Sequence, residues 1–391
     1  MTDAVIVDVV RTASGRGKPG GALSGIHPAD LLATVLAALV ERSGIDPGQV
    51  DDVLAGCVGQ AGDQALNIAR TALLVAGFPE SVPGTTIDRQ CGSSQQAVHF
   101  AAQGVIAGAY DVAIACGVES MSRVPMGTAA RGGDPFAPLA RRYPSLPHQG
   151  IGAELIAARW GLAREELDAY SARSHELAAA CASAGGFARD LVPVELPDGT
   201  RHEVDETVRP ATSAAGLGQL PAAFRDEAYA ERYPEIGWVI TPGNSSPLTD
   251  GASAALVMSA ERASRLGLTP RARLHAFAVS GSDPELMLTG PIPATRKVLA
   301  RAGLGIDDID AYEVNEAFAP VPLAWARDLD ADPERLNPRG GAIALGHPLG
   351  GSGTRLLSSL VGHLEDTGGR YGLQTMCEGG GMANATIIER I

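Results

Sequence analysis

Short runs of apolar residues alternate along the chain with longer segments in which apolar residues recur every three or four positions. The short runs predict strands buried on both faces, and the longer pattern predicts helices with one apolar face. In the first third of the chain we expect strands at 4–9, 50–58, 84–89 and 111–120, and helices at 28–42, 67–78 and 91–107. This alternation is typical of an α/β protein with a largely parallel sheet.

The same order of elements returns after position 271. Strand-like runs occupy 271–280, 309–316, 339–346, 371–377 and 383–390, and helical patterns occupy 294–302, 318–328 and 353–365. The apolar run at 251–260 is predicted to be the last strand of the first set of elements, separated from the others by the segment 121–250. Two similar segments, GIDPGQVDDVLAGCV and GLGIDDIDAYEVNEA, support an internal repeat.

The repeat predicts an α/β fold of two βαβαβαββ halves related by a pseudo-twofold axis, each with its own sheet. We expect the first half to comprise 1–120 plus 251–270 and the second half to comprise 271–391. The segment 121–250, rich in proline, glycine and charge, is expected to form an inserted loop domain.

Composition narrows the class of protein. With 391 residues, 45% of them hydrophobic, the chain can bury a large core. Its formal net charge of -14 disfavours nucleic acid and anionic membranes as partners. No targeting segment or membrane-spanning run is visible, and five scattered cysteines indicate reduced thiols rather than a disulfide framework. We expect a cytoplasmic protein.

Cys91 is the first candidate for chemistry, because it stands between a predicted strand and a predicted helix. A helix N-terminus carries partial positive charge and favours a thiolate, the reactive form of cysteine. A buried structural cysteine is the alternative, and it is the commoner fate of a free cysteine.

His347 and Cys377 lie in two glycine-rich loops of the second half. His347 stands in GGAIALGHPLGGSGTR, where a permissive backbone lets a loop approach a ligand closely. A phosphate cradle is the alternative, although the spacing is not that of a P-loop. Cys377 opens CEGGGMA, whose backbone N–H groups could form an oxyanion hole or simply a tight turn between the last two strands. All three residues follow strands, at the edge where α/β sheets bind ligands.

Four segments, DRQCGSSQQA, NEAFA, GGAIALGHPLGGSGTR and CEGGGMA, resemble in this order the signature blocks of the thiolase family. The resemblance spans the whole chain and is especially close to degradative thiolases of actinobacteria, in IACGVESMSR and TIIERI. It implies an acyltransferase in which Cys91 attacks a 3-ketoacyl-CoA, becomes acylated and passes the acyl group to CoA. His347 would activate Cys91, and Cys377 would act as the acid towards the departing acetyl-CoA enolate.

The resemblance assigns roles to further residues. It implies one oxyanion site formed by His347 with a water held by Asn315, and a second formed by the N–H groups of Cys91 and Gly379. Coenzyme A and acyl-CoA are implied as substrates, with no permanently bound cofactor and no metal. A homodimer or a dimer of dimers is the implied assembly.

The remaining assignments concern binding. The resemblance places Ser246 against the pantetheine arm of CoA and Phe318 in the acyl pocket. His148 matches a histidine of some short-chain biosynthetic members, but Gln149 replaces the methionine that accompanies it there. Glu378 stands where an apolar residue is common in the family.

Several other functions remain open from sequence. Within the family, the chain could degrade fatty acyl or steroid side-chain thioesters, or form acetoacetyl-CoA from short chains. A condensing enzyme of the ketoacyl-synthase type would pair its cysteine with two histidines, or with one histidine and an asparagine, so the second thiol disfavours it. Two thiolates and an imidazole would also suit a catalytic zinc ion. A non-catalytic acyl-CoA or lipid carrier of this fold is the alternative without enzyme activity.

Overall fold

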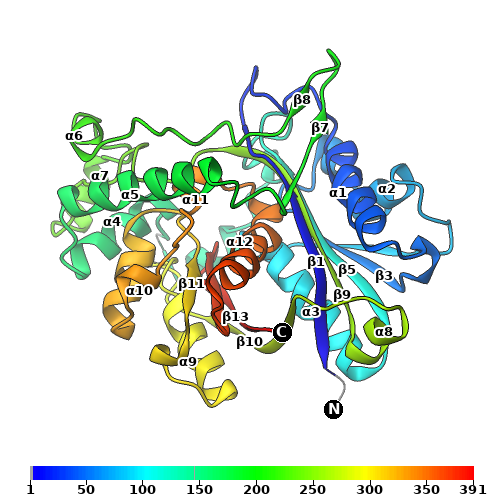
Figure 1. The fold of residues 1–391 in the computed structure, drawn as a ribbon. Helices are drawn as coiled ribbons and strands as arrows, with labels where there is room; N and C mark the ends of the chain where they lie inside the picture. Colours follow the sequence, from blue (N-terminus) through cyan, green and yellow to red (C-terminus); the bar gives the residue numbers. More distant parts are fainter. Residues whose placement is uncertain (1–2, 145) are drawn as a thin grey trace.

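A computed structural model describes residues 3–144 and 146–391 (Figure 1). Its main feature is a sheet of eleven strands. Nine of them run in the order β11 (Ala311–Val314), β12 (Tyr371–Glu378), β13 (Met382–Arg390), β10 (Ala272–Gly281), β1 (Ala4–Thr12), β9 (Thr249–Ser259), β5 (Val112–Ser120), β3 (Asp52–Gly56) and β4 (Gly84–Ile87). The short strands β2 (Gly15–Arg16) and β6 (Leu191–Val192) pair with β9 and β1.

The predicted internal repeat is confirmed by the order and direction of the strands. Outward from the centre, the first half runs β1, β9, β5, β3 and the second half runs β10, β13, β12, β11. In each half the first two pairings are antiparallel and the third is parallel. The two first strands, β1 and β10, are antiparallel neighbours, as a twofold axis between them requires.

The expectation of a separate sheet for each half is wrong. β1 and β10 pair directly through Val5 with Arg273 and through Ile6 with Ala272, so the sheet is continuous. Among the described residues this junction comprises two residue pairs, whereas the β10 and β13 ladder within the second half extends from Ala272 to Gly281. The halves are therefore joined edge to edge by a short seam, which hydrophobic periodicity does not reveal.

The strand expected at 339–346 is also wrong, because the segment contains a one-turn helix, α11 (Ala342–Leu345). Its backbone donors bond to side chains rather than to a neighbouring strand: the Ile343 N–H donates to Glu316 and the Gly341 N–H donates to Ser174. A short buried apolar run cannot be assigned to helix or strand by periodicity alone. The second half consequently has no counterpart of β4 among the described residues.

Helices cover the sheet in layers. Two of them, α3 (Ser93–Ala107) and α12 (Ser352–Thr367), pack against each other and against strands of both halves, where they share one apolar core. The helices α1 (Pro28–Ser43) and α2 (Ile68–Val75) cover the outer face of the first half, and α9 (Pro291–Ala302) and α10 (Pro320–Leu329) cover that of the second. Figure 1 shows α3 and α12 at the centre between these outer layers.

A long segment separates β5 from β9, two strands that pair with each other. It contains α4 (Gln149–Arg159), α5 (Arg164–Ser183), α6 (Ala214–Leu217), α7 (Glu227–Arg232) and a hairpin of β7 (Val194–Glu195) and β8 (Arg201–His202). Its helices α4 and α5 pack against α10 and α11 of the second half (Figure 1). After β9, the short helix α8 (Ala260–Arg265) leads into the second half. Within the described ranges, no helix is both long and apolar enough to cross a bilayer.

Candidate active site

The three chemical candidates from sequence line one small cavity of about 60 Å³. Cys91 comes from the loop between β4 and α3, His347 from the loop before α12, and Cys377 from the end of β12. Gly379, Ser246 and Phe318 line the same cavity. The fold therefore brings together residues that are as far apart as 286 positions in the sequence, since Cys91 and Cys377 belong to different halves.

The loop that carries Cys91 is held in an uncommon conformation. Gln90 has φ 50°, which non-glycine residues adopt rarely and mostly at functional sites. Ser93 fixes this turn, because its hydroxyl donates to the Gln90 carbonyl (2.6 Å) and accepts from the Arg89 N–H (2.9 Å). Cys91 thus lies just before the first turn of α3, as the sequence predicted.

The surroundings of Cys91 act on the protonation of its thiol. Desolvation of the thiol, assisted by the nearby Glu378 carboxyl, raises the pKa of Cys91 to about 12. Burial therefore opposes the thiolate that the partial charge at the N-terminus of α3 favours. Cys91 is a thiol at rest and needs a base.

His347 is suited to be that base. Its Nδ1 lies 2.6 Å from the Ser352 hydroxyl, which itself donates to the Pro348 carbonyl (2.9 Å). A hydroxyl has one hydrogen, so Ser352 accepts from Nδ1–H. Nε2 therefore carries the lone pair that can take a proton, and this lone pair faces the Asn315 amide nitrogen at 3.4 Å. Burial, together with the nearby Arg355 guanidinium, lowers the pKa of His347 to about 3, so the ring is neutral.

Asn315 lies beside the reactive nitrogen of His347. The Asn315 Nδ2 atom is 3.4 Å from His347 Nε2, and the Asn315 backbone N–H donates to the Thr375 carbonyl within β12. Its Oδ1 atom is buried and has no hydrogen-bond partner among the described residues. A buried acceptor without a protein partner can bind an ordered water.

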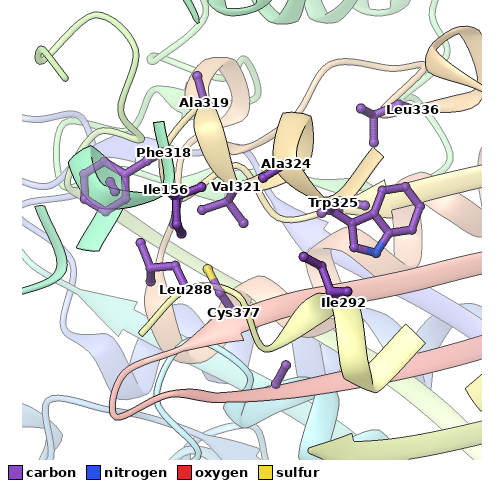
Figure 2. Packing of buried hydrophobic residues seen from close by; sticks show 14 of the residues in the cluster. Ile156, Leu288, Ile292, Phe318, Ala319, Val321, Ala324, Trp325, Leu336 and Cys377 are labelled. Carbon is purple, nitrogen blue, oxygen red and sulfur yellow. The ribbon is translucent and has the colours of Figure 1, made fainter. Parts of the chain in front are cut away.

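Cys377 is fully buried at the end of β12. Figure 2 shows its sulfur among Ile156, Leu288 and Val321, residues of an apolar core to which α4 and the second half both contribute. Burial, then the nearby Cys91 and Glu378 groups, raise its pKa well above the ordinary value for a thiol. Cys377 is therefore a proton donor in the free site.

The glycines after Cys377 bring the second loop close to the first. Gly380 and Gly381 have φ of 84° and 77° and turn the chain from β12 into β13. Gly379 faces the Cys91 loop, where a Cβ on it would lie 3.0 Å from Gln90 Oε1. The glycines therefore form the tight turn between the last two strands, and Gly379 also borders the catalytic cavity.

Glu378 is an acidic residue with an unexpected environment. Its side chain is fully buried beside α3, and neither carboxyl oxygen has a hydrogen-bond partner among the described residues. Burial raises its pKa to about 9, so the group is a neutral acid at pH 7. One signal of this is visible in the sequence, namely an acidic residue directly after an apolar strand.

The binding residues expected from sequence are only partly brought together. Phe318 lines the cavity and packs edge-on against Phe224, with ring centroids 6.0 Å apart. Ser246 also lines it, and its hydroxyl donates to the Ala317 carbonyl. His148 caps α4 and borders a different, larger cavity, while its neighbour Gln149 borders the catalytic one.

The sequence analysis does not identify Glu119, a buried carboxylate that holds loops near the site in place through hydrogen bonds. It accepts the backbone N–H groups of Val58, Gly59 and Gly350 and the side-chain amide of Gln64. The Gly350 contact ties the His347 loop to the first half. The available signal was an acid within the otherwise apolar strand DVAIACGVES.

The zinc alternative lacks a suitable cluster. Across residues 3–144 and 146–391, no group of three or more His, Cys, Asp or Glu side chains is arranged to hold a metal ion. The three reactive side chains share a cavity without forming such a group.

Comparison with known proteins agrees with this geometry. Residues 4–261 match the family model described as thiolase, N-terminal domain, and residues 268–390 match that of the C-terminal domain. Steroid 3-ketoacyl-CoA thiolase FadA6 of Mycobacterium tuberculosis is 49% identical over an alignment covering 100% of this chain and 95% of that protein. The 3-ketoacyl-CoA thiolases of Pseudoalteromonas translucida and Aeromonas salmonicida are 44% and 43% identical, with both partners covered completely.

Proposed function

Because this chain belongs to the thiolase family of acyltransferases, we propose that it cleaves 3-ketoacyl-CoA with CoA, in the degradative direction, through an acyl group carried on Cys91. The observation that carries the proposal is the single cavity shared by Cys91, His347 and Cys377. A biosynthetic enzyme restricted to acetoacetyl-CoA and a non-catalytic carrier are not favoured, given the degradative relatives and the complete set of reactive groups.

In the first step, His347 Nε2 takes the proton of the Cys91 thiol as the sulfur attacks the 3-keto carbon of the substrate. The bond between the second and third carbons of the acyl group then breaks. Its electron pair forms the enolate of acetyl-CoA, which takes the proton of Cys377 and leaves. His347 is protonated, Cys377 is a thiolate, and Cys91 holds the shortened acyl group as a thioester.

In the second step, the Cys377 thiolate takes the thiol proton of an incoming CoA. The CoA sulfur attacks the acyl carbon on Cys91, and the Cys91 sulfur leaves with the proton that His347 had held. The products are a shortened acyl-CoA and free enzyme, with all protons returned. Each proton transfer to or from a positioned group of this kind contributes about 100-fold or more to the rate.

Negative charge on oxygen must be stabilised in both steps. We assign one oxyanion to His347 Nε2–H and a water held by Asn315 Oδ1, which is supported by the unpaired, buried Oδ1 atom. We assign the other to the N–H groups of Cys91 and Gly379, which border the same cavity. A preorganised donor of this type contributes about 3 kcal/mol to the transition state.

The proposal extends to binding and assembly. Ser246 and Phe318 line the cavity where the pantetheine thioester must enter, which supports their assignment to substrate binding. We propose that 121–250 provides most of the CoA surface, that CoA and acyl-CoA bind only as substrates, and that no metal takes part. We further propose a cytoplasmic homo-oligomer, either a dimer or a dimer of dimers.

Thiolysis of acetoacetyl-CoA tests the proposal directly. The wild type should release two molecules of acetyl-CoA for each acetoacetyl-CoA and CoA consumed, and Cys91→Ala should not. Cys181→Ala is a matched control, because Cys181 is a partly buried free cysteine outside the cavity. Full activity in Cys91→Ala would show that the nucleophile is a different group.

A further inference from the structure

Glu378 is an ionisable residue that the proposed reaction does not use, although it lies next to both reactive thiols. It directly follows Cys377 at the end of β12. Its carboxyl group packs against Gly92, the residue after Cys91, where a Cβ on Gly92 would meet the carboxyl carbon at 2.8 Å. One carboxyl group is therefore adjacent in the chain to one thiol and adjacent in space to the loop of the other.

The direction of its side chain keeps Glu378 away from the substrate. Successive side chains of a strand point to opposite faces of a sheet, so Cys377 and Glu378 point to opposite sides of β12. The Cys377 sulfur lies near Leu288 (Figure 2), whereas the Glu378 carboxyl lies against Gly92 at the start of α3. Among the described residues that line the catalytic cavity, Glu378 is absent. Any effect of Glu378 on the reaction must therefore act through the two thiols.

The environment of Glu378 is unfavourable for a carboxylate. Its side chain is fully buried, and within 3–144 and 146–391 neither carboxyl oxygen has a hydrogen-bond partner. Glu119, an acid equally buried near the same site, accepts four hydrogen bonds. A carboxylate without water and without partners is costly, whereas the neutral acid loses much less on burial. Burial accordingly raises the pKa of Glu378 to about 9.

The charged groups around this carboxyl do not reverse the effect of burial. The loop before α3 contributes the Arg89 guanidinium, which favours the ionised form, and the Asp88 carboxylate, which opposes it. On β13, the backbone N–H of Asn384 also favours the ionised form. β12 contributes the Cys377 thiol, and the first residues of α3, at 92–96, are all uncharged. Loss of water is the largest of these effects.

Both neighbouring thiols carry negative charge during the proposed reaction. Cys91 attacks and leaves as a thiolate, and Cys377 is a thiolate between the two steps. A nearby carboxylate disfavours each of these states, because like charges repel strongly where water is excluded. After burial, the Glu378 carboxylate is the next cause that raises the pKa of Cys91 to about 12. After burial and Cys91, it also contributes to the raised pKa of Cys377.

We propose that Glu378 is a positioning residue whose neutral form lets Cys91 and Cys377 become thiolates, and whose ionisation slows acyl transfer and sets the alkaline limit of the enzyme. The proposal rests on the proposed thiolase function and deepens it. A side chain that cannot ionise at position 378 would remove this limit while leaving the three reactive groups in place.

The pH dependence of kcat tests the proposal. We would measure kcat for acetoacetyl-CoA thiolysis from pH 6.5 to pH 9.5 in the wild type, Glu378→Gln and Glu378→Val. The ratio of each variant to the wild type should be constant up to about pH 8, then rise about twofold at pH 9 and about fourfold at pH 9.5, as Glu378 ionises in the wild type. The ratio cancels the ionisation of CoA, which is common to all three proteins. A residue that only supports the structure would change the ratio by the same factor at every pH, and such a constant ratio would overturn the proposal.

Glu176→Gln is the matched control, because Glu176 is an exposed acid on α5 outside the catalytic cavity. Its ratio to the wild type should stay near one at every pH. Wild-type enzyme returned from pH 9.5 to pH 7 should regain its full rate, as expected for ionisation rather than unfolding. Irreversible loss that accounts for the whole alkaline decline would contradict a role for Glu378.

Alkylation of Cys91 by iodoacetamide, located by mass spectrometry, gives a measurement that does not depend on catalysis. Only the thiolate reacts, so the alkylation rate reports how readily Cys91 ionises. The rate in Glu378→Gln relative to the wild type should rise severalfold from pH 7 to pH 9.5. Equal rates at every pH would overturn the proposal. A rising ratio in a protein that does not cleave acetoacetyl-CoA would instead contradict the proposed function, so the two ideas fail separately.

Discussion

The carboxyl group of Glu378 packs directly against Gly92, so closely that a Cβ on Gly92 would lie 2.0 Å from Glu378 Oε1. Gly92 is the N-cap of α3 and follows Cys91. Glu378, at the end of β12, is therefore in close contact with the loop that carries Cys91. The two residues belong to different halves of the molecule. This contact makes Gly92 necessary for a reason that the sequence alone does not reveal.

Gly92→Ala should reduce stability and activity together, because the new methyl group overlaps the Glu378 carboxyl. We expect a loss of about 1–3 kcal/mol in the free energy of unfolding, measured by urea denaturation. Glu378→Ala in the same chain removes the overlapping atoms and should restore part of that loss. Additive effects of the two substitutions would show that the contact does not matter.

Glu378 should also make stability depend on pH. Its pKa is raised to about 9 in the folded protein, above the value near 4.5 of a free glutamate. Its contribution is therefore fully present below about pH 4.5 and is lost as pH rises towards 9, because only the unfolded chain ionises freely over that range. Glu378→Gln cannot ionise, so its melting temperature should exceed that of the wild type increasingly from pH 5 to pH 9.

Glu176→Gln is the control for this measurement, since Glu176 is an exposed acid on α5. Its melting temperature should follow the wild type at every pH. If the Glu378→Gln difference stays constant from pH 5 to pH 9, the carboxyl group of Glu378 is not held neutral in the folded protein.

Ser352→Ala should weaken His347 as a base. The substitution removes the acceptor that holds the hydrogen on Nδ1, so the ring is free to rotate or to place its hydrogen on Nε2. We expect kcat for acetoacetyl-CoA thiolysis to fall about tenfold to a hundredfold with little change in KM. Ser358→Ala removes a similar buried hydroxyl on the same helix, which donates to the Arg355 backbone carbonyl. This substitution should leave kcat near the wild-type value.

Glu119→Gln should loosen the connection between the His347 loop and the first half. Glu119 accepts four hydrogen bonds, and the amide nitrogen of a glutamine would face at least one of these four donors. We expect the free energy of unfolding to fall by about 2–3 kcal/mol. Thermal melting should show the loss of stability, and kcat should fall with it. Glu154→Gln also removes a buried acceptor, of the Val239 and Ile240 N–H groups, but lies away from His347 and should lower stability without a comparable change in kcat.

Most of the architecture could be predicted because it depends on local pattern. Buried strands such as β5 and helices such as α12 follow from runs and periods of apolar residues, and the repeat follows from their order. The helix α11 and the seam between β1 and β10 could not, since both depend on partners distant in sequence: Glu316 supplies an acceptor for α11, and the seam needs the two halves already folded.

The candidate site likewise has features that follow from local sequence and features that depend on the folded surroundings. Cys91, His347 and Cys377 were identified by their loops and by recognisable motifs, and they do share one cavity. The protonation states of Cys91 and Glu378 could not be foreseen, because they are set by how much water the folded protein excludes.

The matching strand order of the two halves has a consequence for how such a site can arise. Two copies of one unit, joined through equivalent edges at β1 and β10, have the layout of a homodimer fused into a single chain. In a homodimer the two subunits have the same sequence, so every substitution occurs in both of them. Each subunit must then contain both the nucleophile and its base. Within a single chain that constraint is absent: here the first half carries the cysteine at the helix start and the second half carries the histidine, so two similar halves form one asymmetric site.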